Sequence, residues 1–165
     1  MRVNVADKKI WPKRGTASMT KDQKPTVMII EEDPGIREYY GLELEDHGYD
    51  VVTMGDVTAV KQAVSRSEPD LIILDPWIRG RYRWDVLSSV KRQDSQIPVL
   101  LCLDFDRHRK CAALVEGVFV KSSSTADLLL KVGQITGREG STSNMWGQGT
   151  SETAEPKKRS EKYQG

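Results

Sequence analysis

Three short apolar runs, each ending on charge, constrain the fold of this chain more than any other feature. Residues 71–75 read Leu-Ile-Ile-Leu-Asp, residues 27–33 read Val-Met-Ile-Ile-Glu-Glu-Asp, and residues 118–121 read Val-Phe-Val-Lys. Uninterrupted apolar runs of this length are typical of strands buried on both faces of a parallel sheet. Functional groups in such sheets collect at the carboxyl ends of the strands. The pattern therefore predicts one site built from several strand ends.

Strand and helix patterns alternate between Pro25 and Gly137, with short polar joints. The expected strands cover residues 26–30, 49–54, 71–74, 99–103 and 118–120. The first helix should begin at Pro34 with Asp33 as its N-cap. The later helices are expected after Asp56, from about Arg83, as a short and weak helix within 107–115, and after a capping-box pattern at 124–127.

Five such units predict an α/β fold in which helices cover both faces of a parallel sheet. We expect a flavodoxin-like, doubly wound, five-stranded sheet of strand order 2-1-3-4-5, with a short or distorted fourth helix. This order brings the ends of the first and third strands together at the switch point. Glu31, Glu32 and Asp75 should then converge.

Charge divides the chain into three parts. Residues 1–24 carry seven Lys or Arg against two Asp (+5), residues 25–137 carry 13 basic against 18 acidic side chains (−5), and residues 138–165 carry five against four (+1). The two outer parts have too few apolar residues to offset the entropy of ordering. We therefore predict a disordered basic leader at 1–24, one domain at 25–137, and a disordered tail at 138–165.

Several classes of protein are disfavoured. Cys102 and Cys111 provide neither a disulfide framework nor metal-ligand spacing, and Cys102 is expected to be a small core residue. No apolar run is long enough for a membrane span, and the leader lacks the apolar core of a secretory signal, so we expect a cytoplasmic protein. No catalytic triad, P-loop or dinucleotide motif is present, so we do not expect an enzyme. Whether residues 1–18 are translated stays open, since Met19 offers a second start.

Clustered carboxylates repel each other unless a cation lies among them. Mg²⁺ is the usual solution, bound through few carboxylates and several waters. An aspartate beside such an ion can accept a phosphoryl group as an acyl phosphate, and Lys121 is placed to pair with a phosphoryl oxygen. The alternative is that Glu31, Glu32, Asp33 and Asp75 are ordinary helix-cap and loop residues. The agreement of three strand ends favours a site.

These residues resemble the receiver domain of bacterial response regulators. Residues 30–38 (Ile-Glu-Glu-Asp-Pro-Gly-Ile-Arg-Glu) are similar to its first-strand motif, 71–75 to the strand with the phosphoacceptor aspartate, and 118–121 to the strand that ends on its lysine. The resemblance implies that Glu31 and Glu32 are the acidic pair, Asp75 the phosphoacceptor and Lys121 the phosphoryl contact. It also implies that the Trp77 backbone carbonyl is a metal ligand, with Glu31, Glu32 and Asp75.

The chain departs from the family pattern close to this site. Glu32 replaces the usual Asp, and the longer side chain puts a tight Mg²⁺ fit in question. Leu103 replaces the hydroxyl residue that contacts the phosphoryl group, Val118 the switch aromatic, and Ser122 the proline after the lysine. Three arginines at 79, 81 and 83 enter the loop after Asp75, either as a solvated face or as an ion-pair partner of Asp75 or Glu32.

Three functions follow as hypotheses. The first is an atypical receiver that signals through protein contact, with phosphorylation of Asp75 impaired. The second is a conventional Mg²⁺-dependent receiver switched by a histidine kinase, with Arg79 or Arg81 replacing the missing hydroxyl. The third is an adaptor that binds nucleic acid or an anionic surface through the basic leader, which we disfavour because charged tails are usually solvated. The expected partners are a histidine kinase or another signalling protein, and a second copy through the face of helix 4, strand 5 and helix 5.

Overall fold

The computed structural model describes residues 24–104, 113–121 and 124–138. These residues form a five-stranded parallel sheet of order β2-β1-β3-β6-β7, which confirms the predicted α/β fold and strand order. The sheet strands are β1 (Thr26–Ile30), β2 (Asp50–Met54), β3 (Leu71–Leu74), β6 (Val99–Leu103) and β7 (Gly117–Val120).

The central strands are buried on both faces because their residues are apolar at every position. All four residues of β3 and all five of β6 are buried. β2 lies at an edge of the sheet and alternates between exposed and half-buried residues. The register pairs Ile30 with Leu74, so β1 and β3 end at the same level. Their carboxyl ends therefore lie side by side, as the sequence predicts.

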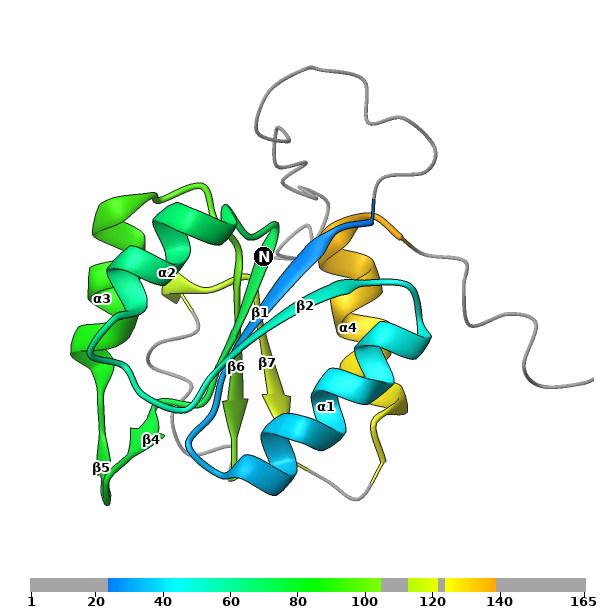
Figure 1. Cartoon of the computed structure of the whole chain (residues 1–165), viewed down its shortest axis with the longest axis horizontal. Helices are drawn as coiled ribbons and strands as arrows, with labels where there is room; N and C mark the ends of the chain where they lie inside the picture. The colour runs from blue at the N-terminus through cyan, green and yellow to red at the C-terminus, as the bar shows by residue number, and fades with distance from the viewer. Residues whose placement is uncertain (1–23, 105–112, 122–123, 139–165) are drawn as a thin grey trace, which may run out of the picture.

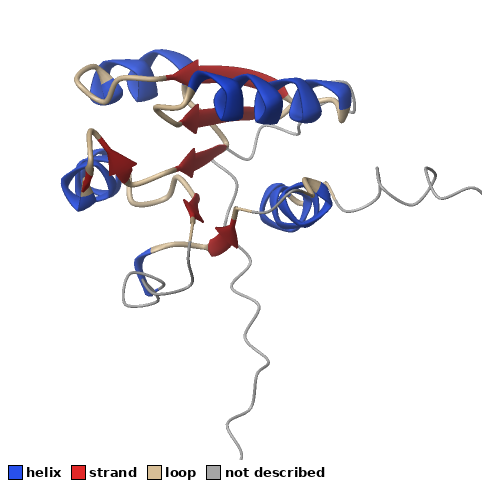
Figure 2. Ribbon diagram, turned by 90° about the horizontal axis from the view of Figure 1, so that it is seen from below, coloured by secondary structure: helices blue, strands red, loops and turns tan. Residues whose placement is uncertain are grey.

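Two apolar layers cover the sheet (Figures 1 and 2). On one face, α2 (Val60–Ser67) and α3 (Trp84–Gln93) pack on a cluster that includes Met28, Ile72 and Leu101. On the other, α1 (Pro34–Asp46) and α4 (Ala126–Thr136) pack on a cluster around Phe119. These four helices therefore cover the two faces of the sheet and not its carboxyl rim.

The start of α1 follows the prediction in detail. The Asp33 side chain accepts a hydrogen bond from the Ile36 backbone N–H at 2.9 Å, and Pro34 occupies the first helical position. Such an N-cap stabilises a helix by about 1 kcal/mol. His47 caps the other end, where Nδ1 lies 2.7 Å from the Glu43 carbonyl oxygen. The N-cap at Asp33 fixes the turn that carries the acidic residues after β1.

Two local structures differ from the prediction. α2 begins at Val60 rather than directly after Asp56, because the Asp56 carboxylate accepts from the Thr58 backbone N–H at 3.0 Å and holds a turn there. The loop after β3 contains an unexpected hairpin of β4 (Trp77–Ile78) and β5 (Arg81–Tyr82). Its turn residues Arg79 and Gly80 have φ of 53° and 72°. The hairpin lies at the carboxyl end of the sheet (Figure 1).

Other expectations fall outside the described residues. The predicted fourth helix and His108 lie largely within 105–112, Ser122 within 122–123, and the leader and tail almost entirely within 1–23 and 139–165. The domain boundaries and the disorder of both ends therefore stay predictions. Among the helices that the structure does describe, none is long and apolar enough to cross a membrane.

Candidate functional site

Lys121 joins the ends of β1 and β3 in one pocket. Its Nζ donates to Glu31 Oε2 at 2.7 Å and to Asp75 Oδ2 at 2.6 Å. The Lys121 backbone N–H donates to the Leu103 carbonyl oxygen, which fixes the lysine at the end of β6. Three residues that lie far apart in the sequence therefore meet at the rim, as expected from the strand ends.

Both carboxylates are nearly inaccessible to water. Glu31 is 2% exposed and Asp75 is 5% exposed. Their remaining oxygens accept from backbone donors: Glu31 Oε1 from the Asp33 N–H at 2.9 Å, and Asp75 Oδ1 from the Trp77 N–H at 2.7 Å. Every carboxylate oxygen of Glu31 and Asp75 therefore accepts a hydrogen bond.

Burial and pairing act in opposite directions on these groups. Burial raises the pKa of the Glu31 carboxyl, and the hydrogen bond from Lys121 offsets part of this effect. Burial alone would lower the pKa of Lys121, but its bonds to Asp75 and Glu31 outweigh that effect and raise it. The lysine therefore stays charged at neutral pH and is the cation of the pocket.

Glu32 does not join this cluster. Its Oε2 accepts from the Arg79 backbone N–H at 2.7 Å, and it is exposed where Glu31 is buried. The Arg79 guanidinium pairs with Asp56 at 3.6 Å, and Arg83 pairs with Asp85 at 2.8 Å. The positive charge beside Asp75 thus comes from Lys121 rather than from an arginine of the hairpin.

In the described residues, the carboxylates at the rim contact protein donors and are not grouped around one cation position. Mg²⁺ requires several oxygens in near-octahedral geometry. Within the described ranges, no group of three or more His, Cys, Asp or Glu side chains is placed to hold a metal. Glu31 and Asp75 share the Lys121 ammonium, Glu32 contacts the hairpin, and Trp77 presents its N–H to Asp75. Their assignment as metal ligands stays a prediction.

Two further residues shape the pocket: Arg37, which had no role in the sequence-based prediction, and Asp104, which was expected as a second carboxylate beside the site. Arg37 Nη1 donates to the carbonyl oxygens of Glu31 at 2.6 Å and Glu32 at 3.1 Å. Asp104 Oδ1 lies 3.9 Å from Lys121 Nζ, on a side chain that is 52% exposed. In the sequence, Arg37 stands out only as part of the first-strand motif. That motif does not indicate that the Arg37 side chain contacts the backbone of Glu31 and Glu32.

The apolar surroundings of the pocket are chemically inert. Leu103 is 2% exposed and packs in the cluster under α2 and α3, so no hydroxyl is present at this position. Cys102 is buried as predicted, and burial raises the pKa of its thiol to about 12. Burial also raises the pKa of Tyr40. Neither group ionises at neutral pH.

The fold and the pocket define a signalling module of the two-component type. A family model for the response regulator receiver domain matches residues 27–132, and the chain belongs to that family. It is 27% identical over 124 residues to the probable transcriptional regulatory protein TcrX of Mycobacterium tuberculosis, covering 73% of this chain and 53% of TcrX. It is 28% identical to the nitrogen assimilation regulatory protein NtrX of Azorhizobium caulinodans, covering 64% and 24%.

Solved structures share the fold. The response regulator TrrA of Thermotoga maritima, in complex with Mg²⁺-BeF, is 21% identical with a TM-score of 0.62, covering 67% of this chain and 98% of that one. The chemotaxis protein CheY4 of Vibrio cholerae is 22% identical with a TM-score of 0.62, covering 68% and 99%. The chain spans about half the length of TcrX, at 53%, and about a quarter of NtrX, at 24%.

Proposed function

We propose that this chain is an atypical receiver module, in which Lys121 closes the acidic pocket and phosphorylation of Asp75 is impaired. As a receiver domain of a response regulator, it acts in two-component signalling. Its output in this proposal is contact with another protein. A histidine kinase or another signalling protein is the partner that family membership favours.

The proposal depends on Leu103, which is 2% exposed and supplies no hydroxyl at the position expected to contact a phosphoryl group, together with the Lys121 bridge to both carboxylates. An acyl phosphate forms when an Asp75 oxygen attacks phosphorus and the bond to the leaving group breaks. Here Oδ2 is bonded to Lys121 and Oδ1 to the Trp77 N–H. Each Asp75 oxygen therefore already accepts one hydrogen bond, which lowers its nucleophilicity. Among the described residues, no group of three or more His, Cys, Asp or Glu side chains is placed to hold a divalent cation.

Phosphorylation with acetyl phosphate tests this proposal directly. The protein is incubated with acetyl phosphate, with and without Mg²⁺, beside a conventional receiver as positive control, and the intact mass is measured. We expect the positive control to gain one phosphoryl mass and this chain to stay unmodified. A gain of one phosphoryl mass that requires Mg²⁺ and disappears in Asp75→Asn would falsify the impaired site.

That outcome would support the second candidate function, a conventional Mg²⁺-dependent receiver switched by a histidine kinase. The observation that favours it is the convergence of Asp75 and Lys121, whose oxygen and nitrogen lie 2.6 Å apart. The structure does not test the third candidate, an adaptor that acts through the basic leader, because residues 1–23 lie outside the described part of the chain.

A second copy of the chain is a further partner in this proposal. Val120 is 39% exposed and Leu130 is 50% exposed, so β7 and α4 present apolar side chains to solvent. Light scattering during gel filtration measures the mass in solution. We expect a dimer that Leu130→Glu converts to monomer, and a monomeric parent protein at high concentration would contradict the dimer.

A further inference from the structure

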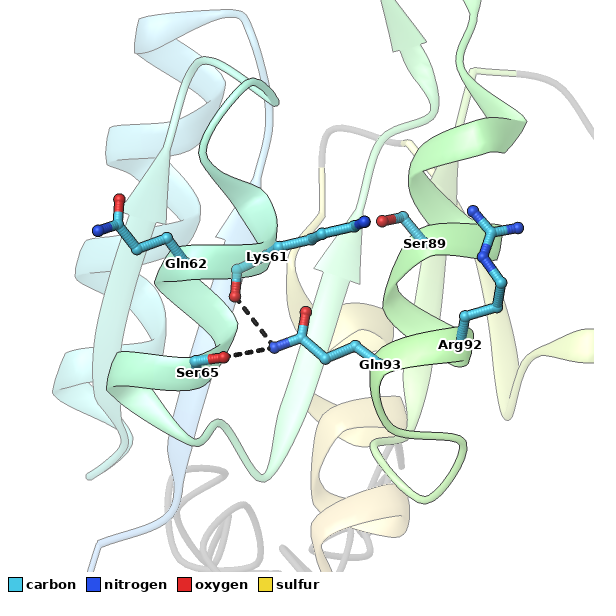
Figure 3. A pocket seen from close by; sticks show the side chains of 6 residues that line it. All are labelled: Lys61, Gln62, Ser65, Ser89, Arg92 and Gln93. Carbon is cyan, nitrogen blue, oxygen red and sulfur yellow. Dashed lines mark hydrogen bonds between the residues drawn. The ribbon is translucent and has the colours of Figure 1, made fainter.

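A shallow cleft lies between α2 and α3 on the outer surface of the domain (Figure 3). Its volume is about 490 Å³, which lies within the size range of small-ligand sites. Six residues line it: Lys61, Gln62, Ser65, Ser89, Arg92 and Gln93. The cleft is distinct from the pocket of Lys121, because it lies over helices and not at the strand ends.

The side chains that line the cleft have one chemical character. None is apolar or acidic, two are cations, and four are neutral hydrogen-bonding groups. Ser89, Arg92 and Gln93 share one face of α3, since residues three and four apart are neighbours on a helix. Figure 3 shows the Lys61 side chain extending across the cleft toward Ser89 and Arg92. Positive charge from both helices therefore faces one space.

The floor of the cleft is held by a side-chain bridge. Gln93 Nε2 donates to the Lys61 carbonyl oxygen at 3.0 Å and to Ser65 Oγ at 2.7 Å. These bonds tie the last turn of α3 to α2. A bridge of this kind fixes the spacing of the two helices before any ligand arrives, which lowers the ordering cost of binding.

Among the ten described cations of residues 25–137, Lys61 and Arg92 belong to the five that form no ion pair with a described carboxylate. Lys91, Arg83 and Lys121 each pair with a carboxylate, whereas neither Lys61 nor Arg92 has a carboxylate within 4.0 Å among the described residues. Residues 25–137 carry 18 acidic against 13 basic side chains, so acidic groups are abundant. Because no acidic side chain lines the cleft, Lys61 and Arg92 make it a positively charged site on an acidic domain.

We propose that the α2–α3 cleft binds a small polyanion that carries phosphate groups. Lys61 and Arg92 supply the charge, and the hydroxyl of Ser89 supplies a further donor. No aromatic side chain lines the cleft, so it offers no ring on which a nucleobase would stack. The ligand is therefore polar throughout, and the site is independent of the chemistry of Asp75.

Titration with sodium pyrophosphate tests the site in the full chain. Amide chemical shifts are followed by ¹⁵N NMR at constant ionic strength, with EDTA present to exclude metal effects. We expect saturable shifts in residues 60–67 and 84–93, with a dissociation constant of about 1 mM or lower. ADP should bind no more tightly than pyrophosphate, because its base finds no aromatic ring to stack on.

Matched double variants separate this cleft from general attraction to positive charge. Lys61→Met with Arg92→Gln should weaken pyrophosphate binding by about tenfold or more. Lys131→Met with Arg81→Gln removes the same charge elsewhere and should leave it unchanged. Shifts outside α2 and α3, equal losses in both double variants, clearly tighter binding of ADP, or the absence of saturable shifts would each overturn the proposal.

Discussion

Lys121 is the residue on which the pocket depends, because it is the cation bonded to both buried carboxylates. Lys121→Met should lower the free energy of unfolding by about 3 kcal/mol near neutral pH, since it leaves buried charge without compensation. Burial raises the Glu31 pKa above its ordinary value of 4.5 even with the lysine present. Removing the ammonium should raise this pKa further.

The sign of the pH dependence follows from that shift. A carboxyl whose pKa is higher in the folded state contributes stability at low pH and loses it as pH rises through the folded pKa. The deficit of Lys121→Met relative to the parent protein should therefore grow between about pH 5 and about pH 8. Urea unfolding of the parent protein and of Lys121→Met at about pH 5 and at about pH 8 measures this deficit. A deficit that is constant or shrinks would show that Lys121 does not compensate Glu31.

Gly55 lies against the guanidinium end of the Arg37 side chain. A Cβ at position 55 would lie 2.8 Å from Arg37 Nη1, the atom that donates to the Glu31 carbonyl oxygen. Gly55→Ala should therefore displace Arg37 and destabilise the protein by about 1–2 kcal/mol in urea unfolding. In the Arg37→Ala background the same change should have much less effect. Additive losses in the double variant would contradict the clash.

At the scale of elements, a half-buried ion pair ties α3 to the starts of β6 and β7. Lys91 Nζ donates to Glu116 Oε1 and to the Ile97 carbonyl oxygen, both at 3.0 Å. Glu116 Oε2 accepts from the Val99 N–H at 2.5 Å. The Glu116 side chain is 9% exposed, so the contact is shielded from solvent.

Glu116→Ala should therefore leave a half-buried lysine and a backbone N–H without their acceptor. We expect a loss of about 2–4 kcal/mol in thermal or urea unfolding, together with faster hydrogen exchange at the Val99 amide. Asp127→Ala is the matched control, because it breaks the exposed pair with Lys131 and should change stability by less than about 0.5 kcal/mol. Equal losses would mean that burial does not set the strength of these pairs.

Elements differ in how far the sequence predicts them. β3 and β6 follow from their apolar runs, and α1 from the cap at Asp33, because these signals are local and strong. The β4–β5 hairpin was missed, because two strands of two residues each carry little signal of their own. Gly80 and the aromatic pair Trp77 and Tyr82, whose rings lie 4.8 Å apart, are the features that indicate it in retrospect.

The candidate site was predictable in its composition and less so in its contacts. Strand order alone placed Glu31, Asp75 and Lys121 at one rim. The turn of Glu32 toward the Arg79 N–H depends on the hairpin, so no pattern in the sequence indicates it. The bridge between Lys91 and Glu116 likewise joins residues 25 positions apart, and helix or strand periodicity does not encode such a pair.

At the scale of the whole molecule, the apolar clusters lie within residues 27–132. A shortened chain of residues 24–138 should therefore unfold at the same temperature as the full chain, within about 2 °C. Circular dichroism during heating measures this, and Arg138 must be kept because it donates to the Gly48 carbonyl oxygen. A clearly lower midpoint for the shortened chain would show that residues outside 24–138 add stability.

Glu31 and Lys121 are 90 positions apart, so the ribosome makes them at different times. The segments that form β1 and β3 leave the ribosome before the segment that forms β7. During that interval Glu31 and Asp75 have no lysine to neutralise them. Nascent chains that stop short of residue 121 would have to desolvate these carboxylates unpaired, which is unfavourable. The ribosome must therefore translate Lys121 before Glu31 and Asp75 can be buried. A chain arrested earlier would remain exposed to proteases at the carboxyl ends of β1 and β3.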